Sequence, residues 1–250
     1  MGQGLYKHAR FLTAGDMAIS VELGGSITPA IHRRVLALLV AIQKESLPEI
    51  IDVVPAYRSI LVKYNPLKSS LSDMEKLLRL LEERLDVNPI ESDERIIELP
   101  VVYGGKYGPD LNYVAEHNLL SPKQVIQIHS NITYPVYMMG FSPGFPYLGG
   151  IPERISTPRL ETPRTAIAAG SVGIADNQTG IYPTASPGGW RIIGRTPIQL
   201  FNPTANPPTV VEVGNSVRFI PISEETFKEI EKQIQDGSYS FQSHPRSRQQ

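Results

Sequence analysis

The sequence predicts an α+β protein of two domains, and three observations lead to this interpretation. In the first hundred positions the apolar residues follow strand and helix periods in the order strand, helix, strand, strand, helix, strand. From residue 134 onward the apolar runs are short and are separated by glycine and proline. The hydrophobic content of 41% is that of a globular chain. We therefore expect a sheet covered by helices, followed by a closed or nearly closed β-barrel.

The first domain is assigned to residues 1–103. Its two helices are expected to begin at the N-caps Thr28 and Ser72, where a side-chain oxygen can accept from the first free backbone amides. His32, Arg33 and Arg34 are expected on a solvated face of the first helix. The order of elements is that of a ferredoxin-like sandwich, in which two helices cover one face of an antiparallel sheet. The four strands are expected at residues 17–23, 50–54, 59–64 and 95–101.

The second domain is assigned to residues 104–237, and residues 238–250 are expected to form a flexible tail. The glycine-rich segment 104–108 has the wrong spacing for a nucleotide-binding loop, and no sustained helix follows it. Short helices are expected at residues 110–118 and 121–128, and a longer one at 223–235. The barrel strands are expected at residues 134–139, 166–175, 181–183, 190–195, 198–201 and 217–220.

Composition excludes several classes of protein. The 24 basic and 25 acidic residues leave a net charge of −1, so the chain has no basic excess with which to bind nucleic acid. There is no cysteine, which excludes disulfides and thiolate chemistry. No signal-like N-terminus or long apolar run is present, so we expect a cytoplasmic protein without a membrane partner. No two histidines have the spacing of metal ligands, and no metal site is predicted.

The stretch from Gly140 to Arg195 is the predicted working surface. It combines glycines and prolines with aromatic, hydroxyl and cationic side chains more densely than any other part of the chain. Glycine allows the backbone to approach a ligand closely, and proline stiffens the loop between such points. His129 lies just before this stretch, at the C-terminal end of a predicted helix, where the helix dipole would favour a protonated ring. It is either a general acid or base, or a capping residue.

The motifs in this stretch and before it resemble those of the family that contains the B subunit of 5-oxoprolinase, KipI and allophanate hydrolase subunit 1. The resemblance covers about residues 5–222 and departs at Ala168 and Ala169, where a Val-Pro pair would be expected. The matching motifs in the first half of the chain are Gly15-Asp16, residues 52–57, 102–105 and 108–111, and His129. Those in the second half are residues 140–148, Pro158-Arg159, Pro163-Arg164, and residues 170–172, 178–183, 186–190 and 193–197.

The resemblance implies a ferredoxin-like domain followed by a cyclophilin-like β-barrel, in agreement with the two patterns above. It also implies two partners: a second, C-type subunit whose related cyclophilin-like barrel faces this one, and a third, A-type oxoprolinase subunit. Together they would open the lactam ring of 5-oxoproline to give glutamate, with consumption of ATP, which would be bound with Mg²⁺ in the assembled complex. No covalently bound cofactor is expected, and the isolated chain is expected to be inactive.

The resemblance and the residue chemistry together nominate the site. His129, Arg159 and Arg164 are the candidate catalytic residues, and Arg159, Arg164, Arg191 and Arg195 can each offer a forked donor to a phosphate or carboxylate. For each arginine the competing interpretation is a surface ion pair, and for Trp190 it is core packing. The candidate substrate or ATP contacts are Gly144, Phe145, Gly170, Ser171, Gln178, Thr179, Tyr182, Ser186, Gly188, Gly189, Trp190 and Arg195.

Two other functions stay open at this point. A KipI-like protein would bind a sporulation histidine kinase and block its autophosphorylation. A protein that acts on urea or allophanate would differ in its substrate and would require a biotin carrier. The cyclophilin-like fold does not imply prolyl isomerisation, because a fold does not carry its relatives' chemistry with it.

Overall fold

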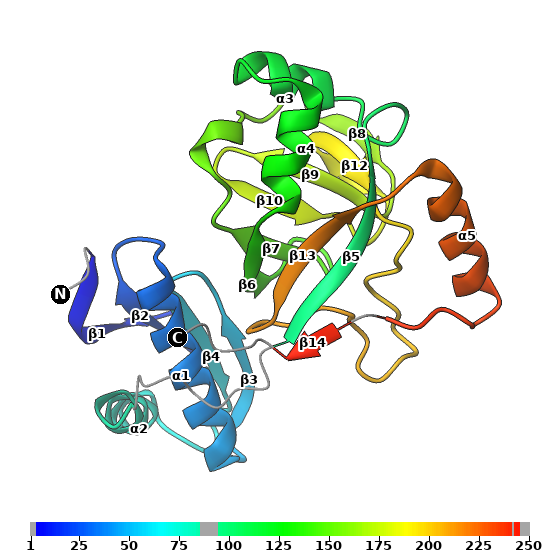
Figure 1. The fold of residues 1–250 in the computed structure, drawn as a ribbon. Helices are drawn as coiled ribbons and strands as arrows, with labels where there is room; N and C mark the ends of the chain where they lie inside the picture. Colours follow the sequence, from blue (N-terminus) through cyan, green and yellow to red (C-terminus); the bar gives the residue numbers. More distant parts are fainter. Residues whose placement is uncertain (1–3, 86–94, 242, 246–250) are drawn as a thin grey trace. The chain divides into compact units, whose positions relative to one another are not determined.

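The computed structural model describes residues 4–85, 95–241 and 243–245. Contacts divide the chain into two compact units, Met1–Ser92 and Asp93–Gln250. Both units combine strands with helices, and the predicted fold class, a sheet with helices followed by a closed barrel, is confirmed. Each unit is described by itself below (Figure 1).

The first unit is a four-stranded antiparallel sheet in the order β1-β2-β4-β3, with two helices packed on it (Figure 1). Thr28 caps the first helix as predicted, through a bond of 3.3 Å from the Ile31 amide to its hydroxyl. The second helix is capped by Ser70 and not by Ser72, because the Ser70 hydroxyl accepts from the Asp73 amide. The elements are β1 (Leu5–Thr13), β2 (Ala18–Gly24), α1 (Pro29–Glu45), β3 (Ile50–Pro55), β4 (Ser59–Tyr64) and α2 (Leu71–Glu83).

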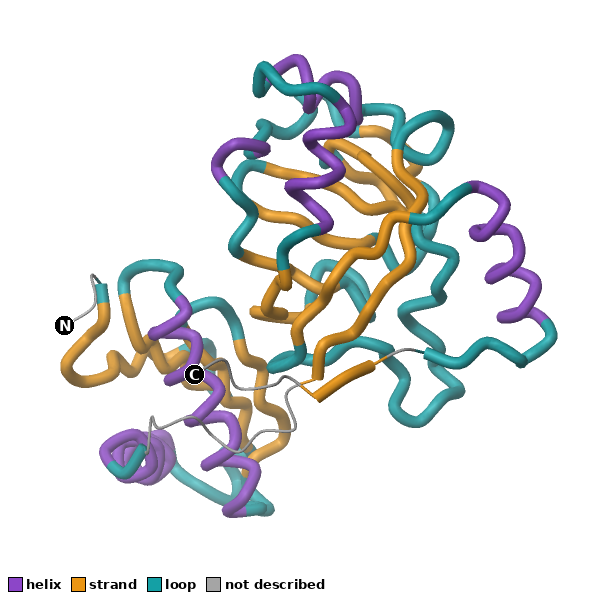
Figure 2. Tube along the Cα trace, viewed as in Figure 1, coloured by secondary structure: helices purple, strands orange, loops and turns teal. Residues whose placement is uncertain are grey.

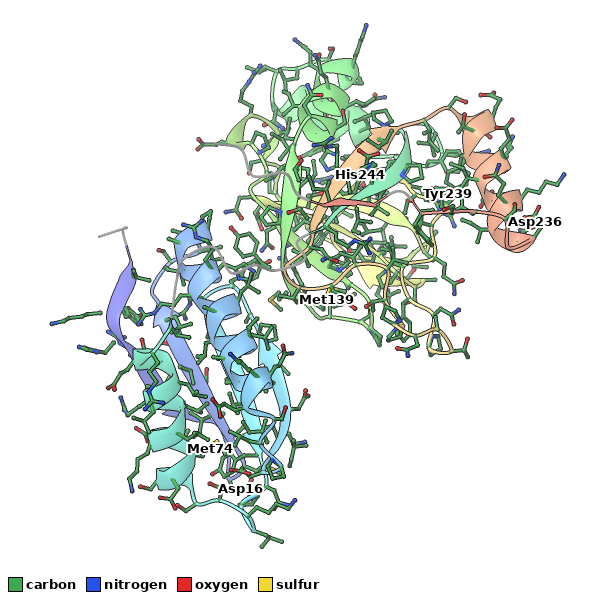
Figure 3. The ribbon with its side chains drawn as sticks, turned by 60° about the horizontal axis from the view of Figure 1, so that its bottom comes forward. Asp16, Met74, Met139, Asp236, Tyr239 and His244 are labelled. Atoms are coloured by element: carbon green, nitrogen blue, oxygen red, sulfur yellow. The ribbon has the colours of Figure 1, made fainter. Side chains whose placement is uncertain are left out.

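The core of this unit lies between the sheet and the two helices. Met74 of α2, labelled in Figure 3, is fully buried in it. Of the residues that were expected on a solvated face, His32 is buried and Arg34 is partly buried, which corrects that prediction. His32 is only 5% exposed, and the Arg34 guanidinium is paired with Glu82 of α2, whose side chain is 6% exposed. Burial lowers the pKa of Arg34. An ion pair that joins α1 to α2 therefore accompanies the apolar core.

The strand expected at residues 95–101 does not belong to this sheet. It is β5 (Arg95–Tyr103), which pairs with strands of the second unit, so the boundary expected at residue 103 differs from the observed division after Ser92. The edge beside β2 is filled instead by β1, an N-terminal strand that the sequence analysis did not identify. The sandwich therefore still has four antiparallel strands. The strand β1, which precedes the first expected strand, takes the place expected for residues 95–101.

The second unit is a closed barrel of seven strands (Figure 2). Its sheet runs in the order β12-β9-β10-β7-β6-β13-β5, and pairing of β12 with β5 closes the ring. The β5–β13 pair is parallel and the other pairs in the ring are antiparallel. Besides β5, the barrel strands are β6 (Thr133–Met139), β7 (Pro146–Gly149), β9 (Ser171–Ala175), β10 (Gln178–Ile181), β12 (Arg191–Arg195) and β13 (Ser216–Pro221).

Further elements lie outside the ring. The run at residues 198–201, expected to be a strand, contributes only an isolated bridge between Phe201 and Thr209. Residues 238–250 were expected to form a flexible tail, but in its described part β14 (Ser243–Pro245) pairs with β5, and Tyr239, labelled in Figure 3, packs against the barrel core. Residues 242 and 246–250 of that tail lie outside the described residues. The remaining elements are α3 (Leu111–His117), α4 (Pro122–Ser130), the short helix η1 (Glu153–Ile155), β8 (Arg164–Ile167), β11 (Ser186–Gly188) and α5 (Glu224–Gln235).

Candidate functional site

A cluster of aromatic rings lines a pocket on the second unit. Phe145 stands at its centre, edge-on to Tyr182 at 5.3 Å and to Trp190 at 5.5 Å between ring centroids. Tyr147 completes the packed group at 4.9 Å from Phe145. Edge-to-face contacts of this kind favour one arrangement of the rings over others. The pocket walls are therefore set by aromatic packing between the start of β7, the end of β10 and the turn into β12.

The pocket has a volume of about 200 Å³. Its walls are Phe141, Phe145, Tyr147, Tyr182 and Trp190, and its other lining residues are Arg159, Leu160, Pro163, Gly188 and Gly189. All of them fall inside the stretch predicted as the working surface. Phe141, Tyr147, Leu160 and Pro163 were not among the nominated contacts, although the first two flank Phe145 in the same motif.

The loop that carries Phe141 has unusual backbone geometry. Phe141 adopts a positive φ of 60°, which is rare for a bulky side chain, and the residue is 63% exposed. Gly144 has a φ of 80°, and a side chain there would come within 2.7 Å of the Phe201 Cβ atom. The nominated Gly144 thus shapes the turn. Strained residues of this type gather at functional sites. Phe141 also lines the candidate pocket, where it forms the exposed wall.

The two glycines before Trp190 differ in the room around them. A Cβ atom at Gly188 would lie 2.3 Å from the Tyr182 hydroxyl, so only glycine fits beside that ring. A Cβ atom at Gly189 would find its nearest neighbour, the Pro163 side chain, at 3.7 Å. Gly188 is therefore required by close packing, whereas Gly189 tolerates a methyl group at the pocket wall.

Arg159 is the cation of the pocket. Its guanidinium lies 5.9 Å from the centre of the Trp190 ring, and its Nε atom is 3.5 Å from a carboxylate oxygen of Asp176. Both partners of this ion pair are more than half exposed, so the pair contributes little to stability. Burial raises the pKa of Tyr147 and of Tyr182, and the positive charge of Arg159 opposes both shifts. The charge therefore acts on the interior of the pocket.

Arg164 is held differently, outside the pocket lining. Its two terminal nitrogens donate to the two carboxylate oxygens of Asp110 at 2.9 and 2.8 Å. Asp110 is only 7% exposed and also accepts a bond of 2.6 Å from the Ile192 amide. The forked pair ties the start of α3 to β8 and β12, which is a structural task. Asp110 stands in the Gly-Pro-Asp-Leu motif, but its role was not foreseen.

His129 lies in the barrel interior and is fully buried. Its Nδ1 atom is 2.8 Å from the Tyr103 hydroxyl, and its Nε2 atom is 2.9 Å from the Thr179 hydroxyl. Thr179 gives its own proton to the Gly173 carbonyl at 2.9 Å, so it accepts from His129. The neutral ring thus carries its proton on Nε2 and accepts from Tyr103. This series of hydrogen bonds links α4 to β5 and β10, two strands that are not neighbours in the barrel.

Burial lowers the pKa of His129 from 6.5 to about 3. The expectation that the helix dipole would favour a protonated ring is therefore wrong, because desolvation outweighs it. The structure does not bring His129 to the aromatic pocket. Of its two interpretations, acid–base catalyst and structural residue, the geometry favours the structural one.

The other nominated residues fall in several places. Phe145, Tyr182, Gly188, Gly189 and Trp190 come together with Arg159 in the pocket. Thr179 is a hydrogen-bond partner of His129, and neighbouring Gln178 begins β10. Gly170, with a φ of 79°, and Ser171 form a turn beside Thr196, where the Arg195 Nε atom donates to the Ala169 carbonyl.

Ser186 and Arg191 also lie outside the pocket lining. The Ser186 hydroxyl is buried and has no hydrogen-bond partner among the residues that the structure describes. Arg191 lies 3.7 Å from the centre of the Tyr113 ring and donates to the Pro158 carbonyl.

A second hollow of about 290 Å³ lies over α4, between that helix and η1. Gln124, Gln127, Ile128, Asn131 and Arg154 line it, and none of them was nominated. No group of three His, Asp or Glu side chains suited to a metal ion occurs within residues 4–85, 95–241 and 243–245. In the same described part of the chain, no helix is long and apolar enough to cross a membrane.

Comparison with known proteins identifies the family. Residues 9–211 match the family of the carboxyltransferase domain, subdomain C and D. The chain is 44% identical over 227 residues to the B subunit of 5-oxoprolinase from Bacillus subtilis (strain 168), covering 85% of this chain and 92% of that one.

Solved structures share the fold of this chain. A conserved uncharacterized protein from Pyrococcus horikoshii shares 50% identity with a TM-score of 0.53, covering 87% of this chain and all of that one. Urea carboxylase of Kluyveromyces lactis shares the fold, with 20% identity and a TM-score of 0.77 over 94% of this chain and 24% of that one. The chain belongs to the carboxyltransferase subdomain C and D family, within its group of 5-oxoprolinase B subunits.

Proposed function

We propose that this chain is the B subunit of an ATP-dependent 5-oxoprolinase, which opens 5-oxo-L-proline to L-glutamate. The observation that carries the proposal is the 44% identity to the B subunit of 5-oxoprolinase from Bacillus subtilis, which extends over nearly the whole of both chains. An enzyme subunit that consumes ATP is expected in the cytoplasm.

The chemistry of the reaction fits a site made for positioning. A lactam is a poor electrophile, and phosphorylation of its amide oxygen by ATP would create a leaving group. Transfer of a phosphoryl group requires orientation and positive charge more than a protein nucleophile. The aromatic pocket supplies a shaped surface that can orient a small substrate, and Arg159 at its edge can hold an anionic group of that substrate. ATP and Mg²⁺ would be bound in the assembled complex.

We further propose that the site is completed by partners, a second barrel subunit of the C type and a third subunit of the A type. Phe141 supports this, because it is an aromatic residue that is 63% exposed at the edge of the pocket. Large apolar side chains exposed beside a pocket are typical of surfaces that another molecule covers. The isolated chain would then lack part of the catalytic machinery.

The test is reconstitution. The chain is purified alone and with its two partner subunits, and ATP hydrolysis and glutamate formation are measured with and without 5-oxo-L-proline. We expect oxoproline-dependent turnover only when all three subunits are assembled. A correctly assembled complex that hydrolyses no ATP in response to oxoproline would overturn the proposal. Urea and allophanate in the same assay test the alternative substrates, and an autophosphorylation assay with a sporulation histidine kinase tests the inhibitor function.

A further inference from the structure

We propose that the aromatic pocket is the subsite for the 5-oxoproline ring and that Arg159 binds the ring's carboxylate. This inference rests on the proposed function and specifies what the pocket holds. It gives Arg159 a task in substrate binding, and it assigns ATP to a place outside this pocket.

The size of the pocket favours 5-oxoproline over ATP as its ligand. Pockets for drug-sized ligands measure roughly 300–1,000 Å³, whereas this one measures about 200 Å³. A single five-membered ring with its carboxylate fits such a volume. A nucleotide with three phosphates does not, and the lining residues named above include one arginine and no lysine for its charges.

The walls suit a flat, weakly polar ring. Phe141 and Phe145 meet edge to face at 5.4 Å, and Trp190 stands edge-on to Phe145. The faces of such rings pack well against a small planar amide, which carries no net charge. The carboxylate is the only charged group of 5-oxoproline near neutral pH, and it needs a cation at the edge of an otherwise apolar pocket.

Arg159 is the arginine whose present partner is easily exchanged. Arg164 is held by both oxygens of the buried Asp110, and Arg195 donates to a backbone carbonyl. Arg159 is paired instead with an exposed carboxylate, that of Asp176, at 3.5 Å. Because an exposed ion pair is worth only about 0–1 kcal/mol, a ligand carboxylate can replace Asp176 at small cost.

Direct binding is the first test, and Trp190 is its probe. It is the only tryptophan of the chain and lines the pocket, so its emission reports occupancy. The full chain is titrated with 5-oxo-L-proline, with 2-pyrrolidinone, which has the ring but no carboxylate, and with ATP. We expect 5-oxoproline to change the emission at lower concentration than 2-pyrrolidinone, and ATP not to compete. Displacement of 5-oxoproline by ATP would overturn the proposal.

Two substitutions should move the affinity in opposite directions. Arg159→Gln should weaken 5-oxoproline binding by at least about tenfold and leave 2-pyrrolidinone binding unchanged. Asp176→Asn should strengthen it by about threefold, because the competing carboxylate is removed. Arg154→Gln, a change at another exposed arginine, is the matched control and should have no effect. Equal loss of both ligands on Arg159→Gln would mean a change of pocket shape and would reject the carboxylate assignment.

Turnover of the reconstituted complex separates this inference from the proposed function. We expect Arg159→Gln to raise the KM for 5-oxoproline by at least about tenfold, with the KM for ATP and kcat unchanged. A wild-type complex that turns over while Arg159→Gln leaves the KM for 5-oxoproline unaltered would reject the inference alone. A rise in the KM for ATP instead would assign Arg159 to phosphate. A wild-type complex with no oxoproline-dependent activity would reject the function itself.

Discussion

The buried histidine of the barrel makes the stability of the second unit depend on pH. The pKa of His129 is about 3 in the folded chain and 6.5 ordinarily, so between these values the unfolded state binds a proton that the folded state does not. Stability is therefore fully present above about pH 6.5 and falls as the pH decreases toward 3. The slope is about 1.4 kcal/mol per pH unit. The folded unit should thus lose about 2 kcal/mol between roughly pH 7.5 and pH 5 through this residue alone.

Urea unfolding followed by Trp190 fluorescence measures this loss in the second unit, because Trp190 is 6% exposed there. His129→Gln keeps a donor and an acceptor but does not titrate, so the variant should lose about 2 kcal/mol less than the wild type over the same pH range. His117→Gln, at an exposed histidine of α3, is the control and should behave as wild type. Equal losses for the wild type and His129→Gln would refute the reasoning.

Four further substitutions test other contacts. Arg164→Ala leaves a buried aspartate without its cation and should lower the stability of the second unit by about 2 kcal/mol, seen as an earlier Trp190 unfolding midpoint; an unchanged midpoint would make the pair a surface contact. Glu82→Gln removes the partner of Arg34 and should destabilise the first unit by about 3 kcal/mol, measured by circular dichroism, with the Trp190 midpoint unchanged; a stable variant would contradict the buried ion pair. Gly188→Ala should cost about 1–3 kcal/mol through overpacking and Gly189→Ala less than about 1 kcal/mol, so equal urea midpoints would refute the difference in space.

The sequence determined the types of most elements and the order of the two folds. Strand alternation before Gly24, the Thr28 cap and the short runs after residue 134 are local signals, because side-chain period and capping depend on neighbouring residues. It did not determine which sheet a strand joins. The strand β5 has the same alternation wherever it pairs, and only contacts with β13 and β12, which lie about a hundred residues away, decide its place.

The sequence also located the candidate site within Gly140 to Arg195, because glycine, proline and aromatic residues are dense there. Only the tertiary structure separated the roles of the nominated residues. Arg159 and Arg164 follow the same Pro-Arg pattern, yet one lines a pocket and the other holds the buried Asp110. His129 was nominated as a possible catalyst, and burial left it neutral inside the barrel. Charge and residue type can be read along the chain, but desolvation and partner distance arise only when distant segments meet.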